Sequence, residues 1–473
     1  MAELEHFDLV GLADAIAKGE VSARDATRWS LQRLDSTGRR LNAVFRIDHE
    51  AAMARAAELD ERQARSGISG PLHGVPLAHK DLFQVAGREC HCGSTLLRGR
   101  KAERTSYALT QLDEAGQVNV GSLHMAEFAL SPTGYNGHYG PAFNPWNAEH
   151  VCGGSSSGSG VAVAARLVFG SMGSDTAGSI RMPASMCGVT GLKTTYRRIS
   201  AEGCVPLSAS LDSMGPLAQS ARDCARLLTY CSRPNAADGL CTSVAHQDYE
   251  AALDGKISGV RIGVPQAYFR SELDPAVGAA LDASLDVLRR CGARIVTAEV
   301  PDMARVNALA KVLMTVEAAT LHRRWVTDHP EAYSVQVRAR IEEGFAYSAV
   351  RYAEALSLRR RVADEFLSTA FATCDLLHAP VLTMQVPTIR ETTEGDPASV
   401  LRTIARIGHT VRGINYLGLP AISVPAGVTA AGLPLAFQLI GKPFAEAQLL
   451  RVADVYQRET DWHRRMPPSA IAA

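Results

Sequence analysis

The chain has 473 residues, and its 49 lysines and arginines are balanced by 49 aspartates and glutamates, so its formal net charge is zero. This balance argues against the basic surface with which proteins hold nucleic acid or an anionic membrane, and we predict neither as a partner. The length suits about three average domains, although one large α/β core is also possible.

Neither the N-terminus nor the cysteine pattern indicates a secreted or metal-binding protein. The opening MAELEHFDLV lacks the basic and apolar regions of a secretory signal, which predicts a cytoplasmic location. The ten cysteines are scattered, so we expect them to be reduced and mostly buried. Cys90-His91-Cys92 has no second pair at zinc-ligand spacing, and we predict no metal there.

The first segments of the chain predict helices. Ser22 and Asp25 resemble a capping box at the start of one helix, and residues 51–65 continue with a helical pattern. We therefore expect residues 1–70 to form a helical arm packed on the rest of the protein. In the next segment, HGVPLAHKDLF (73–83), an apolar strand-like run ends at Lys80. Burial there would lower the lysine pKa and leave a base, whereas a solvated Lys80 beside Asp81 is the alternative.

The segment VCGGSSSGSG (151–160) has the composition of a flexible linker. An Ala/Val-rich stretch that resembles the start of a buried helix follows at once, so we expect a tight, structured loop. In the next segment, 173–188, a strand-like run enters a turn before Ser179. Such a turn can aim backbone N–H groups at a developing oxyanion, although a simple strand-to-helix turn has the same pattern.

Further along the chain, strands and helices alternate. We predict strands within 259–265, 293–300 and 374–382, a helix with its apolar stripe at Val277, Leu281, Leu285 and Leu288, and a surface loop over 391–399. The uncharged segment 417–441 could span a bilayer by its length, but its prolines and glycines favour two buried strands joined by a turn at 427–432. This alternation is typical of an α/β fold.

Three separate segments, HGVPLAHKDLF, CGGSSSGSG and GSDTAGSIRMPASMCGVTGLK, together resemble the amidase signature family. The resemblance covers most of the chain and implies a single large α/β/α domain, residues 1–473, with a central mixed sheet. It implies a Ser-Ser-Lys triad with Ser179 as nucleophile, Ser155 after a cis peptide bond as bridge and Lys80 as base. No metal or organic cofactor is required.

The resemblance also implies which groups meet the substrate. The backbone N–H groups of Thr176, Ala177, Gly178 and Ser179 match the oxyanion-binding turn, and we expect Arg181 to pair with Asp175. The segment 125–147 matches one that lines the acyl pocket, which makes Ala129 and Ser131 candidate substrate contacts. Tyr135, His138 and Tyr139 are weaker candidates.

These matches favour an amidase that hydrolyses a linear carboxamide or aryl amide. Met182 stands where a related branch holds a carboxylate with arginine, which disfavours a small dicarboxylic monoamide. The first alternative is the glutaminase (A) subunit of a glutamyl-tRNA amidotransferase-like complex. Arg359 falls near that subunit's carboxylate-binding arginine and favours it, whereas Gly408 stands where the subunit has the acid that holds the glutamine ammonium group.

A second alternative is a non-catalytic binding protein on the same fold, although Lys80, Ser155 and Ser179 are all present. By resemblance we expect a homodimer and a small-molecule amide substrate.

Overall fold

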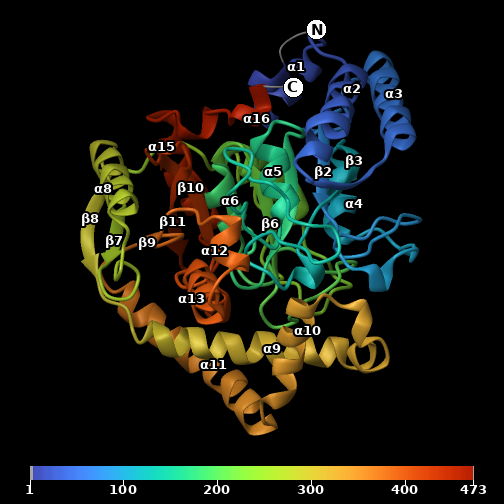
Figure 1. Ribbon diagram of the computed structural model, residues 1–473. Coiled ribbons are helices and arrows are strands. Elements are labelled where there is room, and N and C mark those ends of the chain that lie inside the picture. The colour runs from blue at the N-terminus through green and yellow to red at the C-terminus, as the bar shows by residue number, and fades with distance from the viewer. Residues whose placement is uncertain (1–3, 472–473) are drawn as a thin grey trace.

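The computed structural model describes residues 4–471, which form two β-sheets surrounded by helices (Figure 1). The large sheet has the strand order β4-β6-β5-β10-β11-β9-β7-β8. Strand β7 runs parallel to β8 and β9, and the other pairs are antiparallel, so the sheet is mixed as predicted. Its strands are β4 (Gly170–Asp175), β5 (Thr190–Lys193), β6 (Ser213–Ala218), β7 (Arg261–Pro265), β8 (Arg294–Ala298), β9 (Leu376–Pro380), β10 (Ala421–Val428) and β11 (Pro434–Gly441).

Helices cover both faces of this sheet. On one face α7 (Ala221–Cys231), α8 (Pro275–Arg290) and α15 (Glu446–Arg458) pack together, and on the other α5 (Ser157–Ala164) and α6 (Arg181–Cys187) pack together. The four apolar positions predicted for the stripe of α8 are all buried. The α/β/α prediction is therefore confirmed.

The uncharged segment 417–441 forms the predicted pair of strands. β10 and β11 are antiparallel neighbours at the centre of the sheet, joined by a turn in which Gly432 has a φ of 79°. Nearly every residue of both strands is buried. Among the described residues, no helix is both long enough and apolar enough to cross a membrane.

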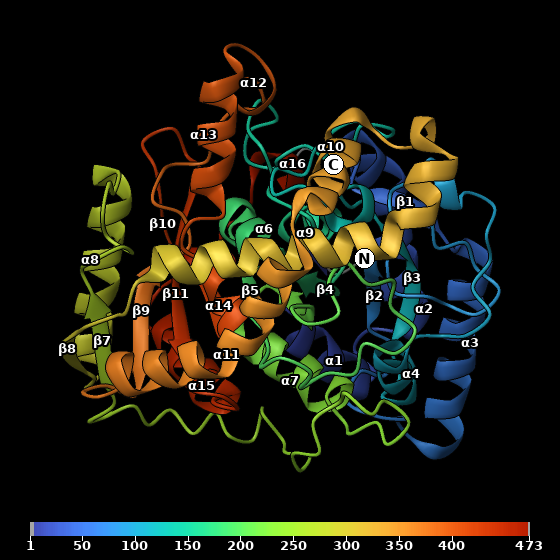
Figure 2. The ribbon, with the colours of Figure 1, turned by 90° about the horizontal axis from the view of Figure 1, so that it is seen from below.

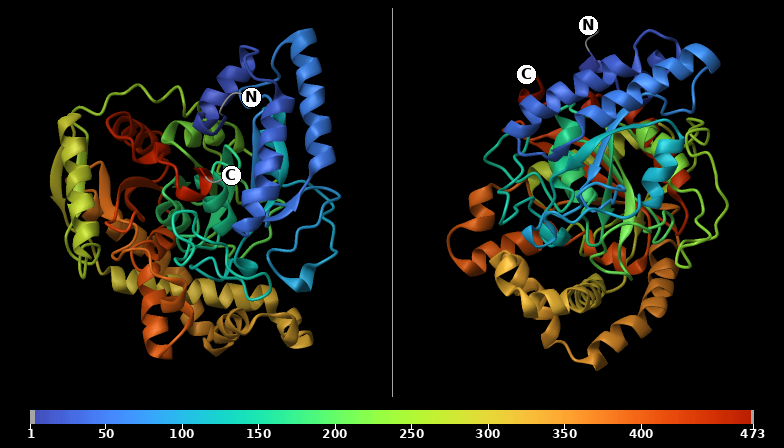
Figure 3. Two further views of the ribbon diagram at one scale, coloured as in Figure 1. Left: turned by 45° about the horizontal axis from the view of Figure 1, so that its top comes forward. Right: turned by 90° about the vertical axis from the view of Figure 1, so that its right-hand side faces the viewer.

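The N-terminal region is only partly the helical arm that the sequence predicts. Helices α1 (Leu9–Ala17), α2 (Ala23–Arg33) and α3 (His49–Ser66) are present, and Figure 3 shows α2 beside α3 at the margin of the molecule. Strand β1 (Val44–Ile47) interrupts them and pairs with β3 (Val118–Leu123), whose other neighbour is β2 (Pro76–Lys80). Because this segment completes the small sheet, we infer that 1–473 is one domain. Residues 1–3 of the arm lie outside the described residues.

Several further helices lie beyond the large sheet. Figure 2 shows α9 running across the molecule, with α10 and α13 rising on one side of it and α11 on the other. The helices are α4 (Tyr107–Glu114), α9 (Met303–Asp328), α10 (Val335–Glu343), α11 (Ala349–Ala370), α12 (Ile389–Thr393), α13 (Pro397–Ile407), α14 (Arg412–Leu417) and α16 (Pro468–Ile471). The surface loop predicted for 391–399 is wrong in part, because the capping side chains of Thr388 and Asp396 extend helical structure into both ends of it.

Gly215 in β6 provides a test of how tightly this sheet is built. A β-carbon at position 215 would overlap the carbonyl oxygen of Leu192 in β5, whereas one at the loop residue Gly239 would meet nothing within 4 Å. We expect Gly215→Ala to destabilise the fold by about 1–3 kcal/mol, the usual cost of overpacking. Thermal unfolding would show this as a lower midpoint, with Gly239→Ala as the control. An unchanged midpoint for Gly215→Ala would contradict the close approach of β5 and β6.

Candidate active site

Lys80, Ser155 and Ser179 come from three separate elements that meet beside the large sheet. Lys80 is the last residue of β2, which packs against β4, and Ser155 lies in the loop before α5. The Lys80 Nζ lies 2.7 Å from the Ser155 Oγ, and the Gly154–Ser155 peptide bond is cis, as the resemblance implies. Ser179 lies in the turn after β4, and its carbonyl oxygen accepts a hydrogen bond from the Ser156 N–H at 3.3 Å.

The hydroxyl groups of the two serines are not directly linked. Among the described residues, no hydrogen bond joins the Ser155 and Ser179 hydroxyls, and the second partner of Lys80 is the Ser174 Oγ at 2.8 Å. Ser174 was not among the predicted residues, although it directly precedes Asp175 in one of the motifs. In proteins without substrate, catalytic hydrogen bonds are often long and shorten when substrate binds.

Burial controls the charge of Lys80. The side chain is fully buried, and this desolvation lowers the pKa of Lys80 to about 7, although the negative charges of Asp212 and Asp175 oppose the shift. A lysine with a pKa near 7 is substantially neutral at neutral pH and has a lone pair for a proton. The solvated lysine considered as the alternative is therefore wrong.

The turn between β4 and α6 presents free N–H groups beside Ser179. Among the described residues, the backbone N–H groups of Thr176, Ala177 and Ser179 have no hydrogen-bond acceptor. Gly178 differs from the prediction, because its N–H donates to the Asp175 Oδ1 at 2.7 Å. Three of the four predicted N–H groups thus remain available for an oxyanion, and Gly178 serves to close the turn.

A buried cluster around Asp175 holds this turn in place. Arg181 donates to both carboxylate oxygens of Asp175, at 3.0 and 3.1 Å, which confirms their predicted pairing. Asn415 of α14 donates to the Asp175 Oδ1 at 2.8 Å, and Gln438 of β11 accepts from Arg181 at 3.0 Å. Burial favours the neutral acid, but the Arg181 charge and hydrogen bonds, with Lys193 and Asn415, hold the pKa of Asp175 well below its usual value.

Ser179 opens onto a cavity of about 490 Å³. The predicted contacts Ala129 and Ser131 line it, together with Thr176 and Ala177 of the turn, while Tyr135, His138 and Tyr139 do not. Its remaining wall comes from α6, the loop after β5, α9, α10, α13 and α14, and includes Met182, Leu207, Lys311, Arg340, Glu343, Gly408 and Arg412.

The structure corrects the prediction for Arg359. This arginine of α11 does not line the cavity, because its guanidinium donates to the backbone carbonyl groups of Tyr416 and Ser210, each at 2.7 Å. The arginines that do line it are Arg340 and Arg412, which the motifs did not indicate. The spacing of charges along helices far apart in the chain offered no signal that they would face one cavity.

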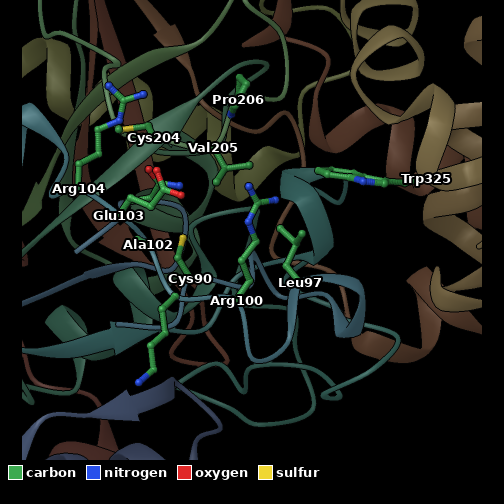
Figure 4. A pocket seen from close by; sticks show the side chains of 13 residues that line it. Cys90, Leu97, Arg100, Ala102, Glu103, Arg104, Cys204, Val205, Pro206 and Trp325 are labelled. Carbon is green, nitrogen blue, oxygen red and sulfur yellow. The ribbon is translucent and has the colours of Figure 1, made fainter. Parts of the chain in front are cut away.

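A second cavity, of about 350 Å³, lies apart from the three candidate catalytic residues. Figure 4 shows it between Arg100, Leu97 and Trp325 on one side and Val205 on the other. Since none of Lys80, Ser155 and Ser179 lines it, the cavity at Ser179 is the candidate active site.

Comparison with known proteins agrees with this geometry. The model of the family described as Amidase matches residues 25–450. The chain belongs to the Amidase family. Members of this family hydrolyse C–N bonds, so the family places the chemistry in the class that the site geometry suits.

The similar proteins include both components of larger enzymes and single enzymes. The A subunit of glutamyl-tRNA(Gln) amidotransferase from Myxococcus xanthus is 35% identical over 98% of this chain and 100% of its own length. The corresponding protein of Neisseria gonorrhoeae is 38% identical over 90% of this chain and 92% of its own.

Among solved structures, a vestigial protein complex that reveals the origins of an s-triazine catabolic enzyme has a TM-score of 0.89 and 34% identity, over 96% of this chain and 98% of that one. Native peptide amidase of Stenotrophomonas maltophilia has a TM-score of 0.86 and 28% identity, over 98% of this chain and 99% of that one.

The ion pair at the centre of the turn can be tested by Asp175→Asn. The substitution leaves Arg181 as a buried charge with no anionic partner, and we expect it to reduce the free energy of unfolding by about 3–5 kcal/mol. Denaturant unfolding measures this loss. Asp364→Asn, which removes an exposed ion pair with Arg360, is the control and should cost at most about 1 kcal/mol. Equal losses in the two variants would contradict the role given to Asp175.

Proposed function

We propose that this chain hydrolyses the C–N bond of a linear carboxamide or aryl amide through an acyl-enzyme on Ser179. The observation that carries the proposal is the buried Lys80 Nζ at 2.7 Å from the Ser155 Oγ, beside a nucleophile that opens onto a cavity. The same geometry argues against a protein that only binds its ligand, since a fully buried lysine needs a reason to be there.

The first step is acylation. As the Ser179 Oγ forms a bond to the amide carbon, its proton passes to the Ser155 Oγ while the Ser155 proton passes to neutral Lys80. Substrate binding brings the two serine hydroxyls into hydrogen-bonding contact for this transfer. The carbonyl oxygen becomes an oxyanion, which the free N–H groups of Thr176, Ala177 and Ser179 can stabilise.

The second step releases the amine. Protonated Lys80 returns its proton through Ser155 to the leaving nitrogen, the C–N bond breaks, and ammonia or an amine departs. Water then attacks the ester by the reverse relay, which frees the acid and restores the Ser179 hydroxyl. These steps assign every proton to a residue of the site.

A second candidate function is that of a glutaminase subunit. The relatives named as the A component of an amidotransferase favour it, because they are similar over nearly the whole chain. Their names, and that of the vestigial protein complex, also favour a partner protein over the homodimer expected from resemblance. Against glutamine, Gly408 provides no acid for an ammonium group, and the one carboxylate in the wall, Glu343, already pairs with Lys311.

The experiment that tests the proposal measures ammonia or amine release from linear carboxamides, anilides and glutamine. We expect release from at least one amide by the purified chain and none above background from Ser179→Ala. Ser36→Ala, which changes an exposed serine, is the control. Release that survives in Ser179→Ala would refute the nucleophile, and release from glutamine alone, or only when a partner protein is present, would favour the second candidate.

The pKa of Lys80 predicts how the activity depends on pH. The catalytic base is the neutral amine, so kcat/KM should rise with pH and level off above about 7, where Lys80 loses its proton. Below that value we expect kcat/KM to fall about tenfold per pH unit. An amide with no titratable group measures the profile. A midpoint near the ordinary lysine value of about 10.4 would contradict a desolvated Lys80 as the base.

A further inference from the structure

The wall of the Ser179 cavity carries an excess of positive charge. Three cationic side chains line it, Lys311 of α9, Arg340 of α10 and Arg412 of α14, against one acidic side chain, Glu343. Lys311 and Glu343 neutralise each other, because the lysine Nζ lies 2.6 Å from the Glu343 Oε1. Two guanidinium groups therefore remain in the cavity without an anion of their own.

Arg412 is the less satisfied of the two. Among the described residues, its side chain makes no hydrogen bond and no ion pair, and its Nε is fully buried without an acceptor. The terminal nitrogens are not among the fully buried atoms that lack a partner, so they remain accessible from the cavity. A half-buried guanidinium with no partner pays the cost of desolvation with no return from the protein.

Arg340 is held next to it. Its guanidinium donates one hydrogen bond to the backbone carbonyl of Leu130 and makes no ion pair within the described part of the chain. Burial lowers the pKa of Arg340, and the nearby charge of Arg412 lowers it further. Two cations that repel each other across a cavity are stabilised together by an anion between them, and a guanidinium fork matches a carboxylate.

The backbone brings these two arginines together. Helices α10 and α14 both pack on α9, although they are far apart in the chain. Gly408, at the end of α13, leaves space for Arg412, since a β-carbon there would lie 3.0 Å from the arginine Nη2. Position 408 thus supplies neither bulk nor a carboxylate beside the guanidinium.

We propose that Arg340 and Arg412 form a carboxylate-binding subsite, and that the substrates are amides whose acyl part ends in a carboxylate and carries no ammonium group. This inference rests on the proposed function, because it names the substrate class of the same site. The apolar side chains of Leu130, Met182 and Met314 line the cavity and suit the methylene groups between amide and carboxylate. The prediction against a dicarboxylic monoamide considered position 182 alone, whereas the cations come from α10 and α14.

Binding to the Ser179→Ala chain tests the subsite without requiring turnover. The probes are the monoamides succinamate, glutaramate and adipamate, with pentanamide as the neutral analogue, measured by titration calorimetry. We expect the best monoamide to bind at least about tenfold more tightly than pentanamide, since hydrogen bonds to a charged group contribute about 1.5–3 kcal/mol. Arg340→Met and Arg412→Met should each remove most of that difference and leave pentanamide binding unchanged.

A matched pair at position 408 separates charge from bulk. Gly408→Asp places a carboxylate beside Arg412 and should weaken binding of the monoamide about tenfold or more, whereas Gly408→Asn, of nearly the same size, should not. Thermal unfolding of each variant establishes that it is folded, and these two variants test the subsite even if an arginine variant fails to fold. Equal weakening by Asp and Asn, or equal binding of monoamide and pentanamide, would overturn the subsite.

Kinetics of the unmodified active site then test the substrate class. We expect kcat/KM for glutaramate to exceed that for glutamine, which differs by its ammonium group, and Gly408→Asp to narrow the gap. A preference for glutamine would overturn the inference. If the monoamides bind to the Ser179→Ala chain through the arginines but the unaltered chain releases no ammonia from any amide, the proposed function fails and the subsite stands.

Discussion

The site depends on one buried carboxylate, that of Asp175. Its two oxygens accept hydrogen bonds from the backbone of the turn that follows, from the Arg181 guanidinium and from Asn415. Asn415 and Gln438 connect the same cluster to α14 and β11. A buried ion pair is weak evidence for stability, but one with every lone pair used fixes a geometry. Here it fixes which N–H groups point away from the carboxylate and face the cavity.

The same burial that makes the Asp175 cluster rigid makes Lys80 a base. Desolvation lowers the lysine pKa, while Asp175 and Asp212 limit the shift, so the side chain titrates near neutral pH. A more exposed lysine would remain charged, and one buried without nearby anions would be neutral but a weaker acid partner in the second half of the reaction. The catalytic value of Lys80 therefore comes from a balance between burial and two carboxylates on other elements.

Chemistry and substrate choice occupy different parts of the fold. The catalytic side chains come from β2, the loop before α5 and the turn after β4, all close to the sheets. The charged wall of the cavity comes from α9, α10 and α14, which lie beyond the large sheet. Changes in these helices can alter the substrate without disturbing the relay, which explains how the Amidase family can include both peptide amidase and components of amidotransferases.

The sequence by itself determined the strands of the central sheet, the family and the three candidate catalytic residues, because apolar periodicity and contiguous motifs are local properties. It did not determine that the N-terminal arm contributes a strand, that the Gly178 N–H closes the turn, or that Ser174 contacts Lys80. It also favoured Arg359 over Arg340 and Arg412 as a substrate ligand. Those features depend on where helices distant in the chain pack against one another, so only the tertiary structure decided them.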